Sequence, residues 1–215
     1  MRESVDFALR PAAPEATTAP HAFTGVSWHR IRIGSRTCLS LRGTEKPMHR
    51  YDMRRASRRM DDDAIYEVLA RGKYCTLACI DADGLPYGVP LSYIYMKDDE
   101  EGRAAGLGAI YFHTTNEAGR KLDAFATGRR ACATIVEDVA ARFQDGSFTT
   151  GFSSVMAFGC IRHIENPVTA RKALVGLCMK YLPAHKDGIG AALEADFAAT
   201  AVWALDIEEL SGKKN

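Results

Sequence analysis

Apolar and polar positions alternate in several stretches of the chain, and this pattern predicts β-strands. In residues 73–80, KYCTLACI, one face of the predicted strand is made of cysteine and leucine, which is typical of a half-buried strand. Asp83-Gly84 follows as a hairpin turn. The returning strand, residues 86–96, carries Pro86 and Pro90. Because proline cannot donate to a strand ladder, we expect this strand to lie at a sheet edge or to carry a bulge.

Four more stretches are expected to be strands, namely residues 109–113, 130–137, 148–164 and 200–207. Gly151 and Gly159 interrupt the longest of them and are expected at bulges or bends. The polar residues 138–147 are expected to connect two strands, and residues 211–215 to form a polar tail.

Helical periodicity with matching end signals predicts helices around these strands. The first covers residues 62–70, with acidic residues at its start and Gly72 after its end. Another runs from Asn166-Pro167 to Tyr181, since proline suits the first turn of a helix, and a weaker one covers residues 189–198. Short links between most strands favour antiparallel pairing. We therefore expect a mainly β fold with flanking helices, closed into a small barrel.

The strand at residues 109–113 passes into a predicted helix at a joint rich in hydroxyl groups and cations. Asn116 is a candidate N-cap, since its side chain can accept a hydrogen bond from a first-turn amide. Arg120 and Lys121 follow, although cations are unfavourable close to the N-terminus of a helix. Free amides and two cations at a helix start suit an anion, above all a phosphate. On spacing alone, two solvated surface residues are an equal alternative.

Residues 1–47 differ from the rest of the chain and are expected to form a poorly structured basic extension of a domain that covers residues 48–215. Residues 1–59 hold 12 Lys and Arg against 5 Asp and Glu, whereas the remaining chain holds 16 against 22. The globular part is therefore acidic, and nucleic acid is not expected as its partner. A start of translation at Met48 or Met53 is an open alternative.

The composition is that of an ordinary globular protein, with 47% hydrophobic and 26% charged residues among 215. No apolar run approaches the roughly 20 residues needed to cross a bilayer, and the opening residues lack the apolar core of a secretion signal. Six cysteines are scattered without the spacing of a metal or redox site, so neither a metal nor a disulfide is expected. We expect a cytoplasmic protein without a membrane partner.

Three motifs follow one another along the chain, namely residues 87–95 (YGVPLSYIY), 110–113 (IYFH) and 119–123 (GRKLD). Together they resemble the pyridoxamine 5′-phosphate oxidase-like split barrels, which bind FMN. Within that group the chain is most similar to the 5-nitroimidazole resistance (Nim) proteins, because residues 152–159 and 207–213 also fit that subfamily. The resemblance covers residues 53–213.

The resemblance implies a homodimer with FMN at the subunit interface. The implied cofactor contacts are Val89, Pro90, Leu91, Ser92, Tyr93, His113, Thr114, Thr115, Arg120, Lys121, Ser154 and Val155. Residues 89–93 would line the isoalloxazine ring through backbone groups and one hydroxyl, and residues 113–115 would flank the ribityl chain and the phosphate. Arg120 and Lys121 would hold the phosphate, and residues 154–155 would come from the partner subunit.

The function implied is that of an FMN-dependent oxidoreductase that reduces nitroimidazoles or similar small electron acceptors. Vitamin B6 oxidation is disfavoured, because residues 86–96 lack the basic side chains that the true oxidases carry on this strand. A non-catalytic flavin-binding protein and a haem-binding split barrel are the alternatives from other classes.

His113 is the candidate catalytic proton donor, since histidine has an unperturbed pKa of about 6.5 and titrates near neutral pH. Its alternative role is a hydrogen bond to a loop carbonyl or to the phosphate. A flat substrate would also need an apolar slot. The aromatic candidates for this slot, or alternatively for plain core, are Tyr93, Tyr95, Phe112 and Phe152.

Overall fold

The computed structural model describes residues 53–97 and 106–215. The predictions for residues 1–47 lie outside these ranges, and the division of the chain at residue 47 stays a prediction.

The strands form one antiparallel sheet whose two edges are joined by the chain itself. They are β1 (Tyr74–Ile80), β2 (Pro86–Ser92), β3 (Ile94–Met96), β4 (Ala109–Thr115), β5 (Arg130–Gln144), β6 (Ser147–His163) and β7 (Thr200–Lys214). Their order in the seven-stranded sheet is β2-β1-β5-β6-β7-β4-β3. β2 and β3 therefore lie at opposite edges, yet only Tyr93 separates them in sequence. A sheet with this connection must curl until its edges meet, which confirms the predicted barrel.

Helices flank the sheet as predicted. They are α1 (Asp62–Arg71), α2 (Arg120–Ala126), α3 (Pro167–Tyr181) and α4 (Ile189–Asp196), with short 3-10 turns η1 (Ala56–Arg58), η2 (Pro183–Gly188) and η3 (Phe197–Ala199). α1 begins where the Asp61 carboxylate accepts a hydrogen bond from the Ala64 amide at 2.8 Å. α3 begins where the Asn166 side chain accepts from the Val168 amide at 2.9 Å. Both starts agree with the sequence signals. No helix in the described ranges is long and apolar enough to span a membrane.

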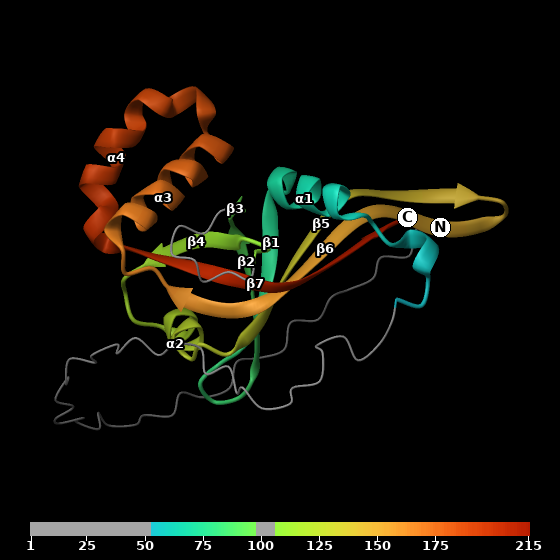
Figure 1. Cartoon of the computed structure of the whole chain (residues 1–215), viewed down its shortest axis with the longest axis horizontal. Helices are drawn as coiled ribbons and strands as arrows, with labels where there is room; N and C mark the ends of the chain where they lie inside the picture. Colours follow the sequence, from blue (N-terminus) through green and yellow to red (C-terminus); the bar gives the residue numbers. More distant parts are fainter. Residues whose placement is uncertain (1–52, 98–105) are drawn as a thin grey trace, which may run out of the picture. The chain divides into compact units, whose positions relative to one another are not determined.

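Buried side chains form two clusters, one on each side of β4 and β7. Inside the barrel, Ile110 and Phe112 pack with residues from α1 and α2. Outside it, Tyr111 and Val202 pack against α3 and α4 (Figure 1). The central part of β4 is thus buried on both faces, which explains why its sequence is apolar at nearly every position rather than at every second one.

Residues 138–147 were expected as a connection, and this prediction is wrong. β5 and β6 instead continue as a two-stranded hairpin beyond the region where β6 pairs with β7 (Figure 1). A bulge lies between Glu137 and Ala140, and Asp138 has a positive φ of 54°. The hairpin is exposed on both faces for most of its length, so its sequence carries no alternation of buried and exposed positions.

Residues 211–215 are likewise mostly strand and not a polar tail, because β7 runs to Lys214 and pairs with β6 along its length. Gly212 is packed so closely against Ile65 of α1 that any side chain there would overlap it. Glycine at position 212 therefore fits the crowded contact with α1.

The two glycines of β6 differ in their roles. The register of the β6–β7 pair shifts between Phe158 and Gly159, which confirms the bulge predicted there. The register of the β5–β6 pair shifts next to Gly151, between the pairs Glu137–Ser153 and Ala140–Gly151, which confirms the irregularity predicted there, although the extra residue lies on β5. Gly151 also leaves room for the guanidinium group of Arg142.

Substitution of Gly159 tests the close approach of β6 and β7. A Cβ atom at this position would overlap the carbonyl oxygen of Asp206, which is backbone and cannot move without breaking the strand pair. Gly159→Ala is expected to lower the free energy of unfolding by about 3 kcal/mol. The matched control is Gly88→Ala in β2, where the nearest atom to the new Cβ is 3.9 Å away on Thr76. Equal midpoints of urea unfolding for the two variants would contradict the close approach of β6 and β7 at Gly159.

Candidate functional site

The predicted helix start at Asn116 is wrong. α2 begins at Arg120 with Gly119 before it, and no side chain caps it. The Asn116 amide donates to the Ala199 carbonyl at 2.9 Å, and its side-chain amide donates to the Ala198 carbonyl at 2.7 Å. Asn116 thus ties the end of β4 to η3. The argument for an anion at the start of a helix does not apply, and the cations must be judged by their own contacts.

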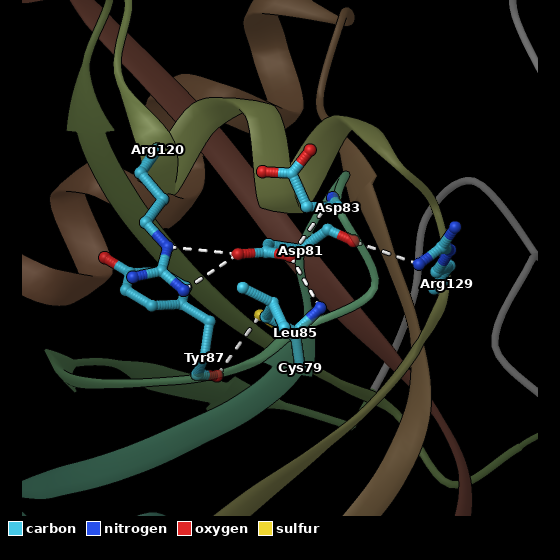
Figure 2. A network of polar contacts seen from close by, with 7 residues as sticks. All are labelled: Cys79, Asp81, Asp83, Leu85, Tyr87, Arg120 and Arg129. Atoms are coloured by element: carbon cyan, nitrogen blue, oxygen red, sulfur yellow. Dashed lines mark hydrogen bonds and ion pairs between the residues drawn. The ribbon is translucent and has the colours of Figure 1, made fainter.

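Arg120 makes an ion pair that its position in the sequence did not reveal. Its Nε and Nη2 atoms donate to Oδ2 of Asp81 at 3.1 and 2.8 Å (Figure 2). The Asp81 side chain is only 6% exposed, whereas that of Arg120 is 56% exposed. The guanidinium group also lies over the ring of Tyr87, 4.8 Å from its centroid. One edge of Arg120 is therefore held by the protein while the rest of the group faces solvent.

Asp81 itself organises the turn between β1 and β2. Its Oδ1 atom accepts hydrogen bonds from the amides of Leu85 at 2.8 Å and Asp83 at 3.1 Å (Figure 2). The Leu85 amide, followed by Arg120, lowers the pKa of Asp81 below its ordinary value. The sequence signal was only the turn motif at Asp83-Gly84. The partner of Asp81 lies 39 positions away and no local pattern indicates it.

Arg129, at the start of β5, contacts the same residue from another direction. Its Nη1 atom donates to the backbone carbonyl of Asp81 at 2.9 Å (Figure 2). Asp81 is thus contacted by Arg120 through its carboxylate and by Arg129 through its carbonyl. The β1–β2 turn, α2 and the start of β5 are thereby joined around one buried carboxylate.

The three predicted residues of β4 do not share a face. His113 and Thr115 are exposed, whereas Thr114 is buried and its hydroxyl accepts a hydrogen bond from the Trp203 indole at 3.2 Å. The side chain of Thr114 is therefore committed to the barrel core. Partial burial, with a smaller effect of the Lys121 charge, lowers the pKa of His113 below its ordinary value. His113 is thus mainly neutral at neutral pH.

The five predicted residues of the cofactor strand also alternate. Val89, Leu91 and Tyr93 are buried in the barrel, whereas Pro90 is exposed and Ser92 is half-buried on the other face. Among the described strands β2 pairs with β1 alone, so its second edge is open, as its prolines predict. This edge offers backbone groups, which is the kind of contact that the resemblance implies for most of these residues.

Ser154 and Val155 face opposite sides of β6. Val155 is completely buried in its own barrel, so its side chain does not fit the role of a contact across an interface. Ser154 lies opposite Val136 on the outer face of the sheet. That face continues onto the β5–β6 hairpin, and its exposed apolar side chains are Tyr74, Ile80, Val136, Met156, Phe143 and Phe148. A hollow of about 410 Å³ lies on the sheet next to Tyr87, between β2 and β5.

The aromatic slot expected from the sequence does not form as a unit. Tyr93 and Phe112 are completely buried and belong to the core. Tyr95 is partly buried and stacks on Tyr66 with ring centroids 5.8 Å apart. Phe152 is half-buried beneath Lys213. Only the last two retain surface that a substrate can contact.

Within the described ranges, no three His, Cys, Asp or Glu side chains are grouped as a metal site would require. Cys75 and Cys79 are buried on one face of β1, as predicted, and both are free thiols.

Comparison with known protein families identifies the family of this chain. Residues 61–214 match the family described as pyridoxamine 5′-phosphate oxidase. The chain belongs to this family. The predicted resemblance to flavin-binding split barrels is therefore confirmed at the level of the family. None of the curated proteins matches the sequence.

Solved structures with a similar fold include flavin and haem proteins. A candidate 5-nitroimidazole antibiotic resistance protein from Bacteroides thetaiotaomicron is 20% identical with a TM-score of 0.56, over 73% of this chain and 86% of that one. The flavocytochrome Anf3 from Azotobacter vinelandii is 21% identical with a TM-score of 0.62, over 77% and 72% of the two chains. The FAD and haem binding protein from Mycobacterium smegmatis is 20% identical with a TM-score of 0.57, over 72% and 71%. At these identities the likeness shows the fold alone.

Asp81→Asn tests the central role of the carboxylate. The substitution removes the charge that pairs with Arg120 and weakens the turn, so the melting temperature at pH 7 is expected to fall by about 3 °C or more. Because the pKa of Asp81 is lowered in the folded state, its contribution to stability is present above its ordinary pKa and is lost as the pH falls through the folded value. The difference between the variant and the wild type should therefore shrink as the pH falls below the ordinary carboxyl pKa of about 3.9.

Asp83→Asn is the matched control for this measurement. Asp83 stands in the same turn and contacts Asp81 through its amide alone (Figure 2). If thermal melts of the two variants gave equal losses at pH 7, Asp81 would have no special role.

Proposed function

We propose that this chain is an FMN-dependent oxidoreductase that reduces nitroimidazoles or similar small, flat electron acceptors. The observation that carries the proposal is Arg120, held by Asp81 over Tyr87 of β2 and followed in α2 by Lys121, in a chain of a flavin-binding family. The fold of the candidate nitroimidazole resistance protein supports the choice of acceptor.

The phosphate of the cofactor is assigned to Arg120 and Lys121. Asp81 holds the Nε and Nη2 atoms of Arg120, which leaves Nη1 for a ligand and fixes the plane of the guanidinium group over Tyr87. Arg120, Lys121 and Arg129 carry three positive charges, and Asp81 and Asp83 of the β1–β2 turn carry two negative charges, so the net charge of this group is positive. The remaining charge suits a phosphate monoester, which is close to a dianion at neutral pH.

The ring system is assigned to the open edge of β2, where residues 89–93 offer backbone groups and Ser92 offers a hydroxyl. His113 and Thr115 are exposed on β4 and are assigned to the ribityl chain and the phosphate, and Thr114 to the same region through its backbone alone. A bound flavin supplies the electron transfer to the acceptor. The residues of this chain bind it, orient it and exclude water from its ring.

The active unit is proposed to be a homodimer that joins the outer faces of two sheets. Exposed apolar side chains run from Tyr74 and Ile80 across Met156 to the hairpin residues Phe143 and Phe148. Several exposed large apolar side chains on one face are typical of a protein interface. Ser154 lies on this face and would contribute to the cofactor site of the partner subunit. For Val155 only the backbone is available for such a contact, because its side chain is buried.

His113 is the proposed proton donor to the acceptor. It is exposed on β4, and the charge of Lys121 contributes to the lowering of its pKa. A lowered pKa makes the protonated form scarcer at neutral pH but a stronger acid. The alternative, a hydrogen bond from a neutral His113 to the phosphate, predicts no dependence of the rate on this titration.

Lys121→Ala tests the phosphate assignment without breaking the Arg120–Asp81 pair. Loss of one charged contact is expected to weaken FMN binding at least tenfold, or by about 1.4 kcal/mol. The affinity is measured by fluorescence titration of the apoprotein, with Lys186→Ala as the control because this lysine is exposed in η2.

The same purified proteins show which cofactor is bound and whether the chain forms a dimer. The purified wild type is expected to show flavin absorbance and to sediment as a dimer. An equal FMN affinity in both lysine variants would refute the phosphate site. A Soret band in place of flavin bands would favour the haem-binding alternative.

His113→Gln distinguishes the two roles of the histidine. If His113 donates the proton, the variant is expected to reduce nitroimidazole about 100-fold more slowly while binding FMN as the wild type does. The wild-type rate should rise as the pH falls below the ordinary histidine pKa of 6.5, because the lowered pKa places protonation there. The variant should show no such rise between about pH 5 and 8. A weaker FMN affinity with an unchanged pH profile would support the phosphate contact instead.

A further inference from the structure

The single residue that joins β2 to β3 is held by a side chain from α3. The Tyr93 amide donates to the Tyr181 hydroxyl oxygen at 2.9 Å. That hydroxyl also lies 3.1 Å from the Tyr93 carbonyl and contacts the carbonyl of Lys73. Tyr181 thus takes the place of a strand partner at the point where the sheet changes edge.

Tyr181 also contacts the predicted ligand-binding strand. Burial raises the pKa of Tyr181, and the nearby Ser92 side chain has a smaller and opposite effect. Ser92 is the one side chain of β2 that the resemblance assigns to the flavin ring through a hydroxyl. Ser92 directly precedes Tyr93, whose backbone is held by Tyr181, so Tyr181 helps to position this end of β2.

Lys180, the preceding residue, places a positive charge at the same point. Its Nζ atom lies 3.8 Å from the centroid of the Tyr93 ring. This atom is buried and has no hydrogen-bond partner among the described residues. Burial and the charge of Lys73 lower the pKa of Lys180 to about 8, whereas Cys75 and Glu137 act in the opposite direction. At neutral pH the group is still mainly charged.

A buried ammonium group without an acceptor is unfavourable for the fold. The cation–π contact with Tyr93 compensates only part of the hydration free energy that the ammonium group loses on burial. The folded pKa of about 8 lies below the ordinary 10.5, so the unfolded chain binds more protons between these values and stability rises with pH across this range. Below about pH 8 the charge on Lys180 costs stability. Stability therefore does not explain this lysine, and unfavourable groups of this kind are typical of functional sites.

The position of Lys180 relative to Arg120 indicates what the charge is for. Arg120 lies over Tyr87 near the start of β2, and Lys180 lies over Tyr93 just beyond its end. The two tyrosines are six positions apart along an extended strand, which corresponds to about 20 Å. A ligand along the open edge of β2 that carries its phosphate at Arg120 would bring its ring towards Lys180.

We propose that Lys180 is the cation that makes this site prefer the reduced, negatively charged flavin ring over the oxidised neutral ring, and that Tyr181 positions Ser92 and Tyr93 for it. This inference rests on the proposed flavin site. A charge close to the ring alters the relative affinity for the two oxidation states, because only the reduced ring carries a negative charge.

Lys180→Met tests the electrostatic part, since methionine keeps an unbranched side chain without charge. FMN affinity is measured for the oxidised form and, under anaerobic conditions, for the reduced form. The ratio of the two dissociation constants is expected to move about tenfold towards the oxidised form. Lys180→Arg, which keeps the charge, should retain a ratio close to that of the wild type.

Tyr181→Phe tests the positioning part with the same readout. This variant loses the hydroxyl but keeps the ring, which packs 6.2 Å from Tyr74. It is expected to weaken the binding of both forms about equally, since it disturbs Ser92 without removing a charge. A large change in the ratio of the two dissociation constants for Tyr181→Phe would contradict the separate roles proposed for Lys180 and Tyr181.

The stability of the apoprotein gives a readout independent of flavin. Lys180→Met should be more stable than the wild type at pH 7, and this gain should disappear as the pH rises from about 8 to 10.5. A wild type that binds no FMN would refute the proposed function and this inference with it. A wild type that binds FMN, with an unchanged ratio in Lys180→Met, would refute only the inference.

Discussion

The structure depends on the constraint that one residue, Tyr93, joins the two edges of the sheet. Two consecutive Cα–Cα steps of 3.8 Å can cover at most about 7.6 Å, so Ser92 and Ile94 must lie close together although β2 and β3 are the outermost strands of the order. The sheet therefore closes, and its inner face becomes a core filled by side chains of all the long strands, α1 and α2. Because β2 and β3 are not paired with each other, each of them keeps one open edge among the described strands, and that of β2 is the longer.

An open edge is normally a liability, since its unpaired backbone groups invite another chain. Here Pro86 and Pro90 interrupt it, and Tyr181 holds the residue at its end. The edge is nevertheless available to a small molecule that offers hydrogen-bond donors and acceptors in a row. The same feature that closes the barrel thus creates a surface suited to the heteroatoms of a flavin ring, which links the fold of the family to the ligand that we propose.

The sequence predicted those elements that have one buried face and failed where the pattern had no such cause. β1 alternates because Cys75 and Leu77 face the core, and α3 starts at Asn166 because its cap is local. The β5–β6 hairpin has little buried surface, so no period marked residues 138–147 as strands. Local signals placed a helix start at Asn116, whereas that side chain bonds to Ala198, 82 positions away.

The candidate site shows the same limit. Arg120 and Lys121 were found because adjacent cations are visible in a sequence, and the motif around them supported a phosphate. Asp81 and Tyr181 were missed because their partners, Arg120 and Tyr93, lie 39 and 88 positions away. Such contacts arise only when the barrel closes, and no spacing along the chain encodes them.

Arg120 and Lys180, the two cations along β2, differ in how the protein compensates their charge. This difference gives them different roles in the proposed site. Asp81 neutralises Arg120 at 2.8 Å, so the guanidinium group is held in place at little cost before any ligand binds. Lys180 has no hydrogen-bonded carboxylate among the described residues and lies over the rings of Tyr93 and Tyr181. A charge that is already compensated can anchor a permanently charged phosphate in every state of the ligand. An uncompensated positive charge attracts a ring more strongly once the ring gains a negative charge. In the proposed site, the preference for the reduced flavin therefore arises at the end of β2, where the barrel closes.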